Sequence, residues 1–147
     1  MPTFTTSKLP LHKSWEEFED ISADIIKKIW GTDYITRNGR LGQKQNGVDI
    51  YGKPPNLNGG YCGVQCKNKK VSIEEIKKEI ENAEGFKPYL KELIFAIVSE
   101  RDANLQESVR ILDSERTKEN KFSIQILFWE DVCLILSDYS DLMEKHF

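Results

Sequence analysis

The feature that most constrains the fold is a run of apolar residues, Leu93-Ile94-Phe95-Ala96-Ile97-Val98. Side chains of a strand alternate between its two faces, so a strand of this composition must be buried on both. Such strands typically lie parallel to a neighbour in a sheet that helices cover on each face. At 147 residues, with 39% hydrophobic and 31% charged content, the chain is long enough for one domain of this kind.

Helical periodicity occurs on both sides of this run. The first helix is expected to begin at Ser14, an N-cap residue with Glu17 at capping-box spacing, and to end at Gly31. Three more helices are expected to begin after Ser72, after Asp102 and at Trp129. The apolar stripe of the first helix is Trp15, Phe18, Ile21, Ile25 and Ile29, with Ile26 at its edge, and that of the second is Ile73, Ile76, Ile80 and Ala83.

Four further strands are expected, at residues 34–37, 47–51, 61–67 and 122–128. The order α, β, β, β, α, β, α, β, α predicts a three-layer α/β domain with a mixed central sheet and flanking helices. We expect residues 14–147 to form this domain, with a short polar tail after the last helix. Residues 1–13 are expected to be an arm or linker. His12, in the arm, and His146, near the terminus, are both expected to be exposed.

Polar side chains gather on the second and third of these strands. On the third strand, Tyr61, Gly63, Gln65 and Lys67 share one face, and Cys62, Val64 and Cys66 share the other. On the second strand, Val48 and Ile50 are expected to point one way, and Gly47, Asp49 and Tyr51 the other. If the two strands form a hairpin on the core, Asp49, Gln65 and Lys67 converge on one patch.

This pattern, Asp49 followed by Gln65-x-Lys67 across a hairpin, resembles the PD-(D/E)xK nuclease superfamily. It is more similar to the Mrr-like restriction endonucleases, in which Gln replaces the second acid. The opening Trp15-x-x-Phe18-Glu19 also resembles the N-terminal motif of that group. The resemblance implies a restriction-endonuclease-like three-layer sandwich with an αβββαβ core, and a metal-dependent DNA endonuclease of a restriction or anti-phage defence system.

The resemblance also implies a catalytic set, Glu19, Asp49, Gln65 and Lys67, and Mg2+ or Mn2+ as cofactor. Glu17 and Glu19 lie at opposite margins of the apolar stripe, and periodicity leaves both open. The resemblance selects Glu19, because the helix acid of the family follows the Phe. The implied metal ligands are the carboxylates of Asp49 and Glu19, the amide oxygen of Gln65 and the backbone carbonyl of Cys66. Lys67 would orient water or stabilise developing negative charge.

Positive charge is concentrated around this pattern. Residues 36–70 contain seven basic residues and one acid, a net charge of +6, in a chain whose total is −3. That distribution is what a phosphate-binding cleft needs, although a solvated charged face would look the same. The residues expected to contact nucleic acid are Arg40, Gln43, Lys44, Gln45, Asn46, Lys69 and Lys70, where the loop residues could equally be turn formers.

Two other classes of function remain open. One is a nucleic-acid-binding or scaffolding module on the same fold that has lost catalysis, with Asp49 and Lys67 as a surface ion pair. The other is a nuclease that acts on RNA or on branched DNA. A homodimer or higher assembly is expected, since cutting both strands needs two sites. A sensor or ATPase protein is expected to be fused to the module or to activate it.

The remaining composition fits an intracellular domain. Cys62, Cys66 and Cys133 occupy apolar faces without Cys-x-x-Cys or Cys/His pairing, so they are expected to be buried thiols in the cytoplasm. The sequence has no run of eighteen apolar residues and no signal-peptide pattern, so no membrane association is expected.

Overall fold

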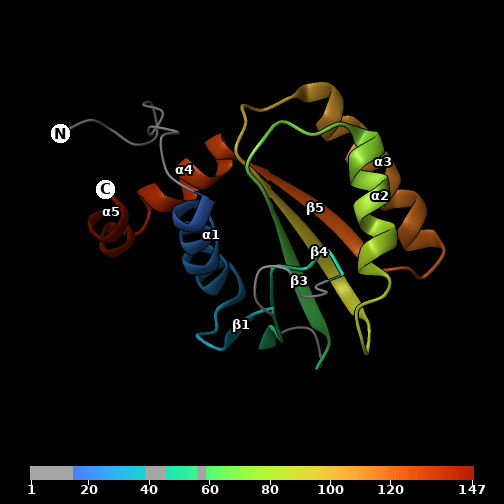
Figure 1. The fold of residues 1–147 in the computed structure, drawn as a ribbon, viewed down its shortest axis with the longest axis horizontal. Helices are drawn as coiled ribbons and strands as arrows, with labels where there is room; N and C mark the ends of the chain where they lie inside the picture. The colour runs from blue at the N-terminus through green and yellow to red at the C-terminus, as the bar shows by residue number, and fades with distance from the viewer. Residues whose placement is uncertain (1–14, 39–45, 56–58) are drawn as a thin grey trace.

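The computed structural model describes residues 15–38, 46–55 and 59–147. These residues form a five-stranded sheet with helices on both faces (Figure 1). The strands are β1 (Ile35–Arg37), β2 (Ile50–Gly52), β3 (Tyr61–Lys67), β4 (Leu90–Ile97) and β5 (Ser123–Phe128). The helices are α1 (Trp15–Trp30), α2 (Ile73–Ala83), α3 (Ala103–Lys118), α4 (Trp129–Ser137) and α5 (Ser140–His146).

The sheet is mixed, and its strands lie in sequence order from β1 to β5. β2 is antiparallel to both of its neighbours, β1 and β3, whereas β3, β4 and β5 are parallel. The apolar run predicted as a central strand forms most of β4, which lies between β3 and β5. The prediction of a mixed sheet in a three-layer α/β domain is confirmed.

Each face of the sheet has its own apolar core. On one face, α1, α4 and α5 pack over Cys62, Val64 and Cys66 of β3. On the other face, α2 and α3 pack over the opposite side of β4. Within β4, Ile94 and Ala96 belong to the first core, and Leu93, Phe95 and Ile97 belong to the second. The double burial inferred from the apolar run is therefore correct.

The predicted helix starts and ends are mostly found. The Ser72 hydroxyl accepts a hydrogen bond from the amide of Glu75 at 3.2 Å, and Asp102 caps α3 through the amides of Asn104 and Leu105. Gly31 ends α1 with φ +67°, a conformation that favours glycine. The Ser14 cap lies outside the described residues.

Three expectations about the helices are wrong. The segment after α4 is not a polar tail but a further helix, α5, whose Leu142 and Met143 are buried against the α1 core. His146 is partly buried rather than exposed: its side chain is only 8% exposed, and its Nε2 lies 2.7 Å from Asp24 Oδ2 on α1. Ile29 is 44% exposed, because the last turn of α1 turns Trp30, 7% exposed, toward the core in its place. No helix within the described ranges is long and apolar enough to cross a membrane.

Candidate active site

Asp49 lies at the start of β2, where the chain bends. Its backbone is fixed on two sides, because its amide donates to Val64 O and its carbonyl accepts from the amide of Asn38, both at 2.8 Å. Its carboxylate Oδ2 accepts the amide of Cys66 at 2.7 Å. These bonds hold the side chain against the end of β3.

The expectation that Val48 and Ile50 point to the same face of the sheet is wrong. Ile50 packs into the α1 core, but Val48 packs into the α2 core, where a Cβ placed on Gly63 would lie 3.0 Å from Val48 Cγ1. The reason is that β2 begins only at Ile50, so the preceding residues do not follow the period of a strand. Asp49 therefore lies where the chain changes from one layer to the other.

Gln65 and Lys67 face α2, as their alternation with Cys66 predicts. Both bind the same acid, Glu79 of α2: Gln65 Nε2 donates to Glu79 Oε2 at 2.5 Å, and Lys67 Nζ forms an ion pair with the same oxygen. Asn82, one turn later, donates to Glu79 Oε1 at 3.0 Å. Burial by itself would raise the pKa of Glu79, but the bond from Lys67 and those from Asn82 and Gln65 outweigh it and lower this pKa.

Glu79 is a site residue that the sequence reasoning missed. It lies three residues after Ile76 and four before Ala83, so helical spacing places it on the apolar face of α2. An acid on that face must find a partner, because a buried unpaired charge is costly. The signal was therefore in the sequence, but the choice of partner required the tertiary contact with β3.

Glu19 approaches from the opposite side of the sheet. Its side chain is 19% exposed, and Oε1 accepts from Arg37 Nη1 of β1 at 3.3 Å. Arg37 also binds Asp20 at 2.5 Å. The negative charge of Glu19 contributes to raising the pKa of Asp49 and of Cys66.

The pKa of Asp49 is raised to about 6. Burial is the main cause, and the negative charges of Glu19 and Glu79 add to it. The amide of Cys66 and the charge of Lys67 act in the opposite direction and are outweighed. A partly buried carboxyl whose pKa is raised by burial and by the charges of two acids is a common feature of sites that bind a cation or transfer a proton.

The oxygen donors present are of the kind that bind a hard divalent cation, but their side chains are not already arranged around one point. Gln65 Oε1 is buried without a hydrogen-bond partner, so one amide oxygen retains unused capacity to coordinate a cation. The Cys66 amide points toward Asp49, and in a strand the carbonyl of the same residue points the same way. No group of three or more acidic, Cys or His side chains in the described parts of the chain is placed to hold a metal. Two of the acids are instead occupied by Arg37 and Lys67.

A shallow depression lies over this site, lined by Gly47, Asp49, Gln65, Lys67 and Lys69, together with Cys66 and Asn68. Lys69 pairs with Glu75 at 3.2 Å, and Lys70 is exposed. Arg40, Gln43, Lys44 and Gln45 lie outside the described residues. The basic segment is thus partly neutralised by acids of α1 and α2, which the charge count along the sequence did not show.

Comparisons of the chain with models of protein families, with curated proteins and with solved structures gave no significant match. Function is therefore inferred from the geometry of the site and from the resemblance of its motifs.

Proposed function

We propose that this domain is a metal-dependent endonuclease that hydrolyses phosphodiester bonds in DNA. The observation that carries the proposal is the meeting of three elements at Asp49. Glu19 approaches from α1, and Gln65 and Lys67 approach from β3, the set that the Mrr-like resemblance implies. The proposal extends to the finer fold, a restriction-endonuclease-like variant of the three-layer sandwich.

In this proposal each site residue would have a separate role. Asp49, Glu19, the Gln65 amide oxygen and the Cys66 carbonyl would hold Mg2+ or Mn2+. When bound, such an ion supplies charge neutralisation at the phosphate and a more acidic water. Lys67 would orient that water or stabilise negative charge that develops on the phosphate oxygens. Glu79 would keep Lys67 and Gln65 in place, because it binds both.

The cellular setting rests on the resemblance alone. We propose DNA as substrate, cytoplasmic location and a role in restriction or anti-phage defence. We also propose assembly as a homodimer, with targeting or activation by a sensor or ATPase partner. RNA and branched DNA are competing substrates, and competition assays against linear duplex would rank the three.

Cleavage of supercoiled plasmid at low salt tests the proposal, with Mg2+, Mn2+ or EDTA. Asp49→Asn and Lys67→Ala are expected to lower the rate by about 100-fold or more, since each removes a group that acts on the reacting phosphate. Lys78→Ala, at an exposed position of α2, is the control and should leave the rate within about twofold of wild type. Cleavage in EDTA, or cleavage that survives both substitutions, would contradict the proposal.

One observation favours an inactive binding or scaffolding module. Glu19 and Glu79 are each paired with a cation of the chain itself, as in a site stabilised without metal. Calorimetric titration with Mn2+ separates the two functions. A nuclease site should bind the ion in a manner that Asp49→Asn abolishes, whereas a scaffold should show no such binding.

A further inference from the structure

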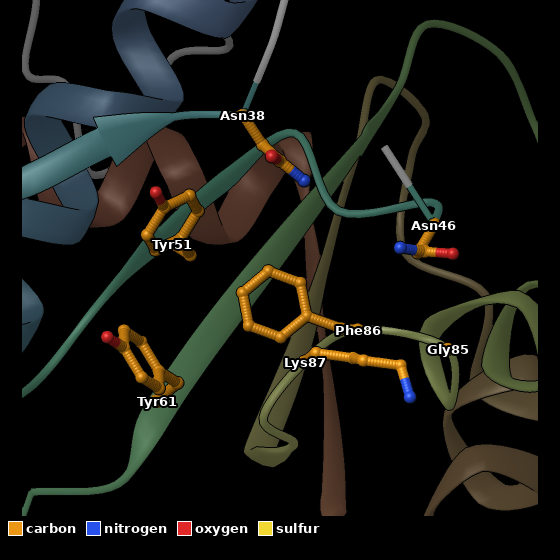
Figure 2. Close-up of a pocket in the computed structure, with 7 residues that line it drawn as sticks. All are labelled: Asn38, Asn46, Tyr51, Tyr61, Gly85, Phe86 and Lys87. Atoms are coloured by element: carbon orange, nitrogen blue, oxygen red, sulfur yellow. The ribbon is translucent and has the colours of Figure 1, made fainter. Parts of the chain in front are cut away.

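A cavity of about 420 Å3 lies beside the candidate active site (Figure 2). It is lined by Asn38, Asn46, Tyr51, Tyr61, Gly85, Phe86 and Lys87. Its volume falls in the range of small-ligand pockets. The nuclease proposal uses none of its aromatic residues.

Three aromatic rings from separate parts of the chain meet in this cavity. Tyr51 comes from β2, Tyr61 from β3, and Phe86 from the segment after α2. The ring centroids of Tyr51 and Phe86 lie 5.4 Å apart, those of Tyr51 and Tyr61 5.9 Å, and those of Tyr61 and Phe86 6.0 Å, all in edge arrangements. Phe86 is 8% exposed and anchors the cluster in the α2 core, while both tyrosines are only partly buried. In an edge contact the edge of one ring meets one face of the other, so the opposite face of that ring is not covered by the contact.

Polar groups lie at the rim of the same cavity. Figure 2 shows the amide of Asn46 and the ammonium of Lys87 on the side of Phe86 away from the tyrosines. Lys53 Nζ lies 4.7 Å from the centroid of the Tyr61 ring. Stacking surfaces combined with amides and lysines match the needs of a nucleobase and its phosphates.

The cavity lies next to the depression over Asp49, since consecutive residues of the chain line the two. Asn46 lines the cavity, and the next residue, Gly47, lines the depression. Asn38 also lines the cavity, and its backbone N–H donates a hydrogen bond to the backbone carbonyl of Asp49 at 2.8 Å. Tyr51 follows Asp49 by two residues in the chain. A strand whose phosphate lies at Asp49 would bring a neighbouring base to the rings.

We propose that this cavity binds one unpaired nucleobase of the nucleic acid held at the active site, adjacent to the scissile phosphate. The inference rests on the proposed nuclease function. It adds a preference for substrates with a single-stranded or displaced nucleotide at the cleavage point, because a base paired in a duplex cannot stack on these rings.

Binding assays in EDTA test this without catalysis. Two series of short single DNA strands are used, one with 2-aminopurine and one with an abasic site at each position in turn. An intact DNA duplex of the same length is the comparison. With wild-type protein, 2-aminopurine fluorescence is expected to be quenched at one position. An abasic site at that position is expected to weaken binding about tenfold, and the duplex to bind about tenfold more weakly than the single strand.

Protein variants assign the effect to the cavity. Tyr51→Leu and Tyr61→Leu are expected to abolish the quenching of 2-aminopurine, and each should bind the abasic strand as tightly as the intact strand. Tyr51→Phe should behave as wild type because it keeps the ring. Tyr34→Leu is the control, since Tyr34 is 89% exposed and does not line the cavity. Thermal unfolding of each variant identifies loss of fold, and the abasic series with wild-type protein stands without any variant.

The two proposals fail in different ways. Equal binding of all abasic strands, or unchanged quenching in folded Tyr51→Leu and Tyr61→Leu, would overturn the base pocket. In that case metal-dependent cleavage that Asp49→Asn abolishes would still support the nuclease. Absence of both nucleic-acid binding and cleavage in the wild type would overturn both proposals.

Discussion

Among single residues, Glu79 determines how the candidate site is held. It accepts hydrogen bonds from Gln65 and from Lys67, two side chains on the same face of β3. Because the Gln65 nitrogen is directed at Glu79, its oxygen Oε1 is directed elsewhere and has no partner among the described residues. The Gln at this position and the acid on α2 are therefore complementary, since a second carboxylate at residue 65 would repel Glu79.

Glu79→Gln tests the positioning role of this acid. We expect the cleavage rate to fall about 10-fold to 100-fold, because Lys67 and Gln65 lose their common partner. Glu75→Gln is the matched control, one turn earlier on α2, where the acid pairs with exposed Lys69. Its rate should stay within about twofold of wild type. Equal effects of the two substitutions on kcat would refute a specific role for Glu79.

Gln65→Glu tests whether residue 65 faces a cation site. The new carboxylate would lie next to Glu79, so the variant is expected to unfold several degrees below wild type without metal. Mn2+ should then raise its melting temperature more than that of wild type, since a bound cation relieves the repulsion. Thermal unfolding at several Mn2+ concentrations measures both effects. A lower melting temperature that Mn2+ does not restore would argue against a metal at this position.

At the level of elements, α5 fastens the C-terminal end of the chain to α1. Lys145 Nζ and His146 Nε2 lie 2.8 and 2.7 Å from Asp24 Oδ2, and Asp24 is 8% exposed. Burial alone would raise the pKa of Asp24, but the bonds from Lys145 and His146 outweigh it and lower that pKa below its ordinary value. The acid of α1 is therefore held in its charged form.

This contact predicts a pH dependence of stability. A lowered pKa in the folded state stabilises the protein above the unfolded value, about pH 4, and this contribution is lost as pH falls through the folded value. Asp24→Asn should lower the free energy of unfolding by about 1–3 kcal/mol at pH 7 and flatten its decline between about pH 5 and 3. Urea unfolding at each pH measures this.

The control for that experiment is Asp141→Asn on α5. Asp141 pairs with Lys28 at 3.6 Å but is 66% exposed, so its loss should cost less than about 0.5 kcal/mol. If the free energy of unfolding declined equally steeply below pH 5 in wild type and in Asp24→Asn, the contact would contribute nothing to the pH dependence.

For the whole molecule, the core on the α1 side of the sheet encloses all three thiols of the chain. Cys62, Cys66 and Cys133 form no disulfide and are buried on the α1 side of the sheet, which confirms the expectation of burial from their apolar positions. Burial raises the pKa of Cys62 to about 12, with a smaller contribution from Glu92. Burial also raises the pKa of Cys66. Neither thiol can form a thiolate readily while the layers stay packed.

Thiol reactivity should therefore report opening of this core. With an aromatic disulfide reagent, native protein is expected to react at least about 100-fold more slowly than protein in guanidinium, where three thiols should react. Ser114→Cys, at an exposed position of α3, should add one fast-reacting thiol. Rapid reaction of two or more thiols in the native wild type would mean that the α1 layer opens readily.

Capping residues and hydrophobic periodicity predict most of the helices and strands, and also which strand faces are buried. Capping at Ser72 and Asp102, the end of α1 at Gly31 and the double burial of β4 follow from residues close in sequence. Periodicity also predicted which face of β3 carries Gln65 and Lys67. These features depend on backbone geometry and on alternation, which a sequence determines within a few residues.

Only the tertiary structure decided the partners of the charged groups. The pairing of Glu79 with Lys67, the burial of His146 on Asp24 and the opposite facing of Val48 and Ile50 all depend on contacts between distant segments. Electrostatic and packing partners depend on which layers meet, and periodicity within one element carries no information about the layer that covers it. For that reason the sequence by itself predicted the strands that carry the site, whereas the fold supplied Glu79 and the aromatic cavity.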